Sequence, residues 1–254
     1  MIGGTDSRSR QPETDRGNPD VLSRRSANSR IGRGREESKK QRKHRVDLKP
    51  ALPLGEGAVS GGGMFNDTSS TLDLLRTRRS GKPRDLIEPG PTDVQLRTIL
   101  EAAIRVPDHG KLAPWRFIII GREDRDRLSA LLTSAYRAEK PEAGRLEIEA
   151  MAQFALFAPT LIVVLSTPVH TSKIPVWEQE LSVGAACMNV LTATHAIGFV
   201  GSWQTGWPAY TDAVRDAFGN VGDRIAGFIF IGSSARSLEE RPRPDYDSIV
   251  KNWG

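Results

Sequence analysis

The sequence has one cysteine, Cys187, and four histidines among 254 residues. A single cysteine cannot form an intrachain disulfide, and no His/Cys grouping with metal-ligand spacing is present. Cys187 lies in the apolar stretch Val183-Gly-Ala-Ala-Cys-Met, which predicts a buried helix and an inert thiol. No Ser-His-Asp set or Cys-His pair is visible either. The sequence therefore predicts neither a disulfide framework nor catalysis by a metal or a protein nucleophile.

Long apolar runs are also absent. No run approaches the roughly 18 residues that a membrane span needs, and residues 1–30 contain no apolar core of a signal peptide. We therefore expect a cytoplasmic protein with no membrane partner. A Gly-x-Gly-x-x-Gly motif after the first predicted strand is missing as well, so the sequence does not support a Rossmann dinucleotide site.

Aromatic residues are absent from residues 1–63, which hold 14 Lys+Arg and 8 Asp+Glu. Residues 64–254 hold 22 Lys+Arg and 23 Asp+Glu, so the positive net charge of the chain comes from residues 1–63. This segment lacks the apolar surface to offset its ordering entropy, and we predict a disordered basic extension. Its interspersed acids favour a solvated tail over a nucleic-acid-binding one. Alternatively, translation begins at Met64 after three glycines, and peptides from residues 1–63 in native protein would contradict that.

Helical and strand-like patterns alternate from residue 64 onward, which predicts one folded domain over 64–254. The expected helices cover residues 71–79, 92–105, 123–138, 142–156, 176–197 and 212–218. The first has Ser70 or Thr71 as its cap and turns Leu72 and Leu75 inward, with Leu74 as a further candidate. The 176–197 helix is small and apolar in its middle, hence buried, and ends at Gly198.

Apolar runs near residues 117, 161, 199 and 228 predict about four strands. The continuous run Trp115–Gly121 is typical of a buried central strand. Strands separated mostly by helices would, on local pattern alone, give a parallel α/β sheet.

Two polar stretches indicate a binding site. Arg78-Arg79-Ser80-Gly81-Lys82 ends the first predicted helix, where an arginine fork and a serine hydroxyl match the oxygens of a phosphate. Cations that complement a helix C-terminus are the simpler alternative. Between Arg105 and Phe117 runs a loop with two prolines, a histidine and a tryptophan, a composition typical of a binding loop.

Together these stretches resemble the nitroreductase family, above all its short subgroup. Arg-Arg-Ser is followed by Pro107-Asp-His and Pro114-Trp, then by Pro175-Val-Trp-Glu-Gln-Glu, Gly198–Thr205 and Ile225–Gly232. The resemblance covers about residues 71 to 250. It implies an α+β fold: a mixed, mainly antiparallel central sheet wrapped by helices, with the long central helix at a homodimer interface.

The resemblance also implies an FMN-dependent enzyme with two FMN sites at that interface. NAD(P)H would reduce FMN and leave, and a nitroarene, quinone or enone would then be reduced in a ping-pong reaction. FMN carries this chemistry, so no catalytic side chain and no metal are expected. The partners expected are a second copy of the chain and a small-molecule acceptor.

The family pattern transfers FMN contacts to ten positions. Arg78, Arg79 and Ser80 would hold the phosphate or ribityl chain, and Lys82 the pyrimidine edge. Arg105 and His109 would reach the flavin of the other subunit. The remaining positions are Trp203, Gln204 and Thr205, which would line the FMN, and Arg243, with Arg241 as the alternative for the phosphate contact.

Several alternatives remain open at this point. The same fold hosts dehalogenating, dehydrogenating and flavin-fragmenting enzymes, and a non-catalytic FMN sensor would share the binding residues. Glu178 and Glu180 could form an acid/base pair, although acids at a helix start are more often solvated or hydrogen-bonded. A protein that binds nucleic acid through its basic tail would show steeply salt-dependent binding.

Overall fold

A computed structural model describes residues 65–254. The expectations for residues 1–63 and for a start at Met64 lie outside the described residues. The five strands of the sheet are β1 (Leu86–Ile87), β2 (Trp115–Ile120), β3 (Thr160–Ser166), β4 (Val200–Gln204) and β5 (Arg224–Ser234). Their order is β1-β5-β3-β2, with β4 also paired to β5, and every pairing in this part of the chain is antiparallel.

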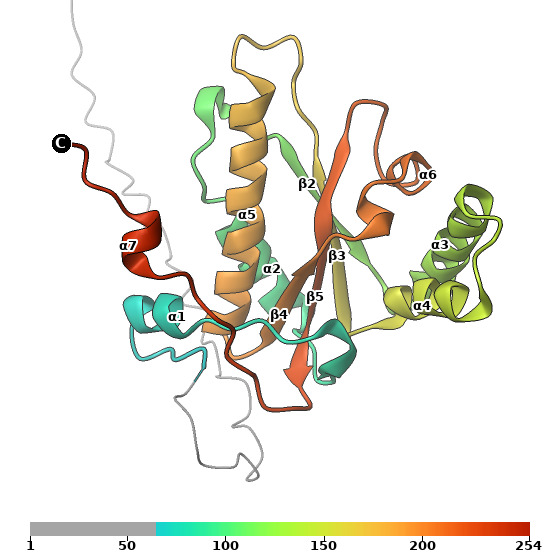
Figure 1. Ribbon diagram of the computed structural model, residues 1–254, viewed down its shortest axis with the longest axis horizontal. Helices are drawn as coiled ribbons and strands as arrows, with labels where there is room; N and C mark the ends of the chain where they lie inside the picture. The colour runs from blue at the N-terminus through green and yellow to red at the C-terminus, as the bar shows by residue number, and fades with distance from the viewer. Residues whose placement is uncertain (1–64) are drawn as a thin grey trace, which may run out of the picture. The chain divides into compact units, whose positions relative to one another are not determined.

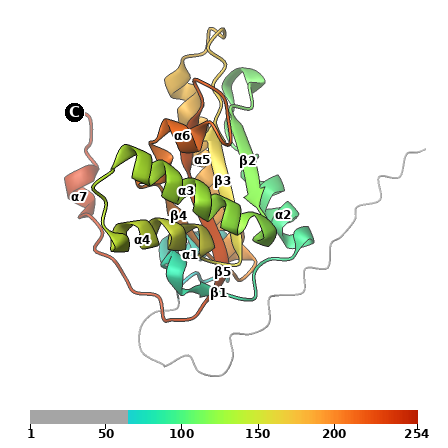
Figure 2. The same cartoon turned by 90° about the vertical axis from the view of Figure 1, so that its right-hand side faces the viewer.

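Helices cover both faces of the sheet (Figures 1 and 2). On one face lie α2 (Asp93–Ala103) and α5 (Val176–Ala196), and on the other lie α3 (Arg125–Glu139) and α4 (Arg145–Leu156). The short helices are α1 (Thr71–Thr77), α6 (Asp212–Arg215) and α7 (Tyr246–Ile249). The α+β architecture expected from the resemblance is confirmed, and the parallel sheet suggested by the local pattern is wrong.

Side chains along β3 and β5 point alternately to the two faces of the sheet, and the core therefore has two layers. Even-numbered residues of β3, such as Ile162, face α2 and α5, whereas odd-numbered ones, such as Leu161, face α3 and α4. Two side chains with no exposed surface, Phe228 and Phe230, extend the second layer against α4. Burial of these apolar faces on both sides of one sheet is the main source of stability.

Local signals in the sequence set several helix ends. The Ser70 side chain accepts a hydrogen bond from the Asp73 amide at the start of α1. Thr92 and Gln95 form the capping box of α2. Gly198 follows α5 with a φ of 91°, a left-handed conformation that favours glycine at a helix C-terminus.

Two predictions about burial are wrong. β2 is an edge strand, not a central one, and Ile119 is 49% exposed. A continuous apolar run shows that a strand is apolar on both faces but does not show whether both of its edges are paired. On α1, the prediction is wrong for Leu72 and Leu75, which are exposed, and is confirmed for the further candidate Leu74, which is buried. The two-residue β1 was not predicted, because so short a segment has no period to detect.

A buried arginine ties α3 to the end of α4. The Arg125 guanidinium donates to the main-chain oxygens of Ile120, Ala155, Phe157 and Pro159. Burial, together with the charge of a neighbouring arginine, lowers the pKa of Arg125 to about 10. This side chain therefore holds the two helices against the sheet face opposite α5.

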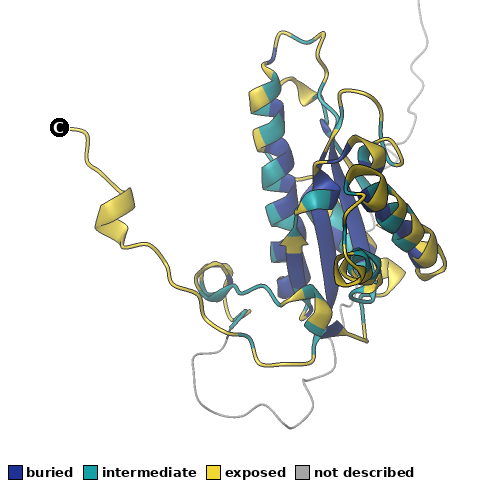
Figure 3. Ribbon diagram, turned by 45° about the vertical axis from the view of Figure 1, so that its right-hand side comes forward, coloured by how far each residue is buried: buried dark blue, intermediate teal, exposed yellow. Residues whose placement is uncertain are grey.

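The chain ends in a segment that leaves the body. Figure 3 shows the sheet and the inner side of α5 as buried, and α7 with the residues around it as exposed. Apolar side chains here have no cover: Tyr246 is 69% exposed and Trp253 fully so. Within residues 65–254, no helix is long and apolar enough to cross a membrane.

Candidate functional site

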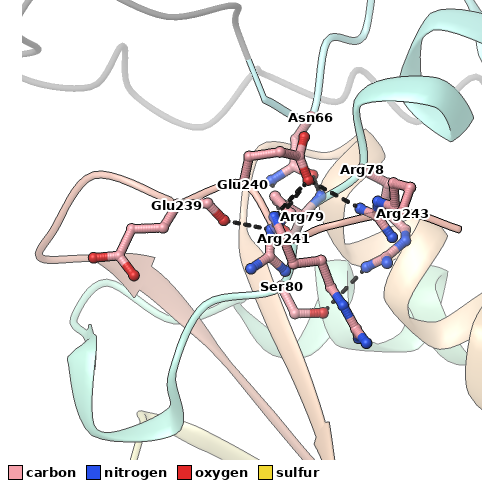
Figure 4. Close-up of polar contacts among 8 residues, drawn as sticks. All are labelled: Asn66, Arg78, Arg79, Ser80, Glu239, Glu240, Arg241 and Arg243. Carbon is pink, nitrogen blue, oxygen red and sulfur yellow. Dashed lines mark hydrogen bonds and ion pairs between the residues drawn. The ribbon is translucent and has the colours of Figure 1, made fainter.

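Four arginines gather where the end of α1 meets the C-terminal segment (Figure 4). Arg78 and Arg79 come directly after α1, and Arg241 and Arg243 come from the C-terminal segment, about 160 residues later. The Arg78 side chain also donates to the Ser80 hydroxyl at 3.1 Å. Guanidinium groups and a hydroxyl thus converge from two distant parts of the sequence.

An asparagine fixes the main chain of this cluster. Asn66 Oδ1 accepts from the Arg79 amide at 2.8 Å, and Asn66 Nδ2 donates to the Arg79 carbonyl at 3.2 Å. Asn66 itself has a φ of 55°, a conformation that asparagine tolerates better than most residues. Gly81 follows closely, and a Cβ there would lie 3.0 Å from side-chain atoms of both Leu86 and Val200. Tight packing therefore holds the segment against β4.

The acids near the cluster pair with some arginines and leave others unpaired. Arg79 donates to the Glu239 carbonyl and lies 3.8 Å from the Glu240 carboxylate. Arg243 is 3.4 Å from Glu240 as well. Across residues 65–254, neither Arg78 nor Arg241 has a carboxylate partner.

Burial is the main cause of a lowered pKa at Arg78, and the positive charges of Arg243, Arg79 and Arg241 add to it. The folded chain therefore disfavours the positive charge that Arg78 carries at neutral pH. Two guanidinium groups without a carboxylate partner among residues 65–254, beside a hydroxyl, have the chemistry of a candidate anion site, and a phosphate monoester with nearly two negative charges would match it.

Lys82 points away from this anion site. Its Nζ lies 3.5 Å from Glu239 Oε2, and both side chains are exposed. The predicted contact of Lys82 with a cofactor ring stays a prediction, and it would require this weak surface pair to open.

The Trp203-Gln204-Thr205 stretch is divided between the two faces of the sheet. In the pairing of β4 with β5, Trp203 lies opposite Ile229, whose side chain faces α5. Gln204 lies opposite Phe228, whose side chain faces α3 and α4. Gln204 Nε2 donates to the Ser202 hydroxyl at 2.9 Å. Thr205 follows the end of β4 and is partly buried. Of the three, only Trp203 is placed by the strand on the face that α5 covers.

Trp203 lies over a glycine at an irregularity of β5. Its Nε1 donates to the Ala226 carbonyl at 3.0 Å, next to the point where the register between β3 and β5 shifts. A Cβ on Gly227 would lie 2.1 Å from the same nitrogen, so a side chain there is excluded. The N–H of Trp203 is therefore used within the fold, and its partly exposed ring is the part that can contact a ligand.

The predicted binding loop lies at the other end of α5. Asp108 shapes it, because its carboxylate accepts from the amides of Leu112 and Ala113 at 3.0 and 2.9 Å. His109 Nδ1 is 2.8 Å from Oε2 of Glu178, in the first turn of α5. The arginine cluster lies instead near the C-terminal end of that helix, beside α1 (Figure 1).

Within one chain, the structure does not bring His109 to the arginine cluster. His195, whose pKa is affected by the charge of Arg78, is in the last turn of α5. At 1.5 Å per residue, its position is about 25 Å along the axis from Glu178. His109 and the arginine cluster therefore lie at opposite ends of α5, whereas the main chain of Arg105 lies beside Asn189, in the second half of that helix.

His195 connects α5 to β4 beside the arginine cluster. It is 1% exposed, and its Nε2 accepts from the Gly201 amide at 3.1 Å, so Nδ1 carries the hydrogen. Burial, with a contribution from the charge of Arg78, lowers the pKa of His195 to about 4. A neutral imidazole thus links α5 to β4 next to the arginines.

The sequence analysis missed one useful residue and gave two others a lower rank or a different role. Asn66 fixes the arginine segment, and Arg241 ranked behind Arg243 although it is the unpaired one. Glu178 was considered only with Glu180, which instead pairs with an arginine of β5 at 3.1 Å. The asparagine just before the first helix was a usable signal, whereas the other two depend on contacts between distant segments. No metal-ligand cluster exists among residues 65–254.

Comparison with protein families matches residues 75–233 to the model of the nitroreductase family. A protein of Escherichia coli K12 named "Putative NAD(P)H nitroreductase YdjA" is 39% identical over 163 residues, which cover 64% of this chain and 87% of that protein. A Haemophilus influenzae protein named "Putative NAD(P)H nitroreductase" is 37% identical over 174 residues, which cover 68% of this chain and 92% of that protein.

Solved structures show the same fold at low identity. A nitroreductase-like family protein from Bacillus cereus has a TM-score of 0.63 and 19% identity, covering 77% of this chain and 99% of that one. A Desulfovibrio desulfuricans protein described as "a putative nitroreductase in complex with fmn" has a TM-score of 0.56 and 21% identity, covering 72% of this chain and 96% of that one. At these identities the likeness concerns the fold alone.

Proposed function

The chain belongs to the nitroreductase family, and from this premise we propose that it is an FMN-dependent oxidoreductase. It would transfer a hydride from NAD(P)H to electron-poor small molecules such as nitroarenes, quinones or enones, in a ping-pong reaction. FMN, when bound, supplies the hydride chemistry at its N5 atom. The side chains of the chain bind and orient the cofactor, and the cytoplasm stays the predicted location.

The observation that carries this proposal is that Arg78 and Arg241 have no carboxylate partner among the residues that the structure describes. Arg78 is partly buried among like charges and donates to the Ser80 hydroxyl. A buried cation without a counter-ion is costly. A terminal phosphate would remove that cost, and it would accept several hydrogen bonds from the guanidinium groups and the hydroxyl. The donor set therefore fits the FMN phosphate.

The other predicted FMN contacts lie either beside the proposed phosphate site or at the end of β4. Arg79 attaches the C-terminal segment through the Glu239 carbonyl and the Glu240 carboxylate, and Arg243 pairs with Glu240 within that segment, so both would shape the phosphate site. Trp203 offers a ring face on the α5 side of the sheet. Gln204 and Thr205 remain proposed contacts, and Gln204 would have to leave its hydrogen bond to Ser202 to reach a ligand on the α5 side.

The outer face of α5 supports the proposed homodimer. Trp177 and Leu181 are 67% and 55% exposed on this face. Further along it, a Cβ added to Gly184 would meet no atom within 4 Å, so another helix can approach closely. Two leucines of α1, Leu72 and Leu75, are also exposed. Surfaces of this kind are typical of interfaces between subunits.

A homodimer would also complete the site. The arginine cluster lies near one end of α5 and the His109 loop near the other. A two-fold axis across the middle of the helix would bring the start of one α5 beside the end of the other. Each phosphate site would then receive the loop of the partner subunit, as the family resemblance implies for Arg105 and His109.

An absorption spectrum followed by anaerobic addition of NADH and NADPH tests the proposal. We expect a flavin spectrum that bleaches, and the faster donor identifies the nucleotide preference. Bound flavin that neither nucleotide reduces would favour an FMN sensor or another flavin reaction on this fold. Colourless protein that fails to bind added FMN would contradict the proposal itself.

A further inference from the structure

Two polar side chains of α5 hold the loop that carries Arg105 and His109. Glu178 contacts the ring of His109, with 2.8 Å between Oε2 and Nδ1. Asn189 donates from Nδ2 to the main-chain oxygen of Arg105 at 3.3 Å. The two α5 residues are about three helical turns apart, so their side chains leave the same face of the helix. α5 thus contacts the loop at both of its predicted cofactor residues.

The contact with Glu178 determines which nitrogen of His109 is available. An ionised carboxylate only accepts hydrogen bonds, so Nδ1 of His109 carries the hydrogen. Nε2 is then the one ring nitrogen left for a ligand, and it faces away from Glu178 because the two nitrogens lie on opposite sides of the ring. The carboxylate therefore sets both the tautomer and the direction of the imidazole.

The main chain of the loop does not need this contact for its shape. Asp108 accepts from two amides, and Gly110, Lys111 and Ala113 take left-handed φ angles of 78°, 56° and 48°. The His109 side chain, by contrast, is 65% exposed. In the described part of the chain, Glu178 is the one hydrogen-bond partner of its ring. Without Glu178 the imidazole would rotate freely on a loop that is already shaped.

We propose that Glu178 is a positioning residue that directs Nε2 of His109, a hydrogen-bond acceptor in this tautomer, to a ribityl hydroxyl of the FMN held by the partner subunit. This inference rests on the proposed function, which brings that loop to the FMN site of the other chain. Glu178 would not touch the cofactor and would act through His109 alone. Asn189 would hold the Arg105 end of the same loop.

Apo protein titrated with FMN tests this idea, with flavin fluorescence as the measure of affinity. We expect Glu178→Ala to weaken FMN binding about tenfold, which corresponds to about 1.4 kcal/mol. Glu178→Gln should recover most of the affinity, because its amide oxygen can still accept from Nδ1. Glu180→Gln is the matched control, since it removes the same charge two residues further along α5, and it should change affinity less than about twofold.

The same substitutions in a His109→Ala background separate positioning from a general structural effect. If Glu178 acts only through His109, Glu178→Ala should change FMN affinity less than about twofold there. An equal loss in both backgrounds would overturn the inference, and so would a Glu178→Ala variant that binds FMN like the wild type. Wild-type protein that binds no FMN would instead overturn the proposed function, and this inference with it. Thermal melting of each apo variant verifies that it is folded.

Discussion

Replacing Arg78 by alanine should separate the cofactor-binding role of the arginine cluster from its structural role. Arg78 has no carboxylate partner within residues 65–254, and its one side-chain hydrogen bond goes to the Ser80 hydroxyl at 3.1 Å. If Arg78 binds the FMN phosphate, its removal deletes a charge-assisted hydrogen bond of about 1.5–3 kcal/mol. We therefore expect the Kd for FMN to rise roughly 10- to 150-fold.

The stability of the apo protein should change much less. Alanine removes the hydrogen bond to Ser80, which is worth about 1 kcal/mol. It also removes a charge that burial and three neighbouring arginines disfavour, as the lowered pKa of Arg78 shows. Because the folded-state pKa lies below the unfolded value, the charged form at neutral pH destabilises the fold. The two effects have opposite signs, so the free energy of unfolding should stay within about 1 kcal/mol of the wild type, or about 2–4 °C in Tm.

The assay pairs an FMN titration by flavin fluorescence with thermal melting of the apo protein. Arg145→Ala is the matched control, because it removes one arginine from an exposed pair on α4, on the opposite face of the sheet. Arg78→Lys should recover part of the affinity, since lysine keeps the charge but lacks the fork. An Arg78→Ala variant with unchanged FMN affinity and a Tm lowered by more than about 8 °C would refute the anion-site argument.

Three further predictions follow from the same contacts. A heterodimer of one Arg78→Ala chain and one His109→Ala chain, isolated with two affinity tags, should keep a single intact FMN site. Loss of both sites would contradict a site built across the interface. Arg125→Met should lower the free energy of unfolding by about 2–4 kcal/mol in denaturant melts, since it leaves several buried carbonyl oxygens unpaired, and unchanged stability would contradict that. The folded-state pKa of His195, about 4, lies below its ordinary 6.5, so wild-type stability should fall by about 1.4 kcal/mol per pH unit from pH 6.5 to 4 through this residue. His195→Gln should lose that slope, and an equal slope in both proteins would count against a buried neutral imidazole.

Local sequence signals predicted the helices of this fold well, because caps and periodicity are properties of neighbouring residues. Thr92, Gln95 and Gly198 have the roles in helix capping that their types favour. The edge position of β2 was not predictable in this way. Which strand lies at the edge of a sheet depends on the partners that other segments provide, and the residues Trp115–Ile120 do not encode them.

For the candidate site too, local sequence patterns were predictable, whereas contacts between distant segments were not. Arg78 and Ser80 are close in sequence, and their pattern alone suggested a phosphate site. Which arginine stays unpaired depends on Glu239 and Glu240, some 160 residues away, and on how the C-terminal segment runs past α1. The family pattern therefore preferred Arg243, whereas the ion pairs leave Arg241 available.

The length of α5 explains why residues so far apart in one chain could serve one cofactor. The helix holds His109 through Glu178 near its start and has His195, next to the arginine cluster, in its last turn. In a two-fold dimer, the separation of the two groups along this helix would fix the position of each loop relative to the phosphate site of the other subunit. Dissociation would then break every FMN site at once, without unfolding either chain. Flavin release on dilution, with helicity unchanged by circular dichroism, is the signature that this arrangement predicts.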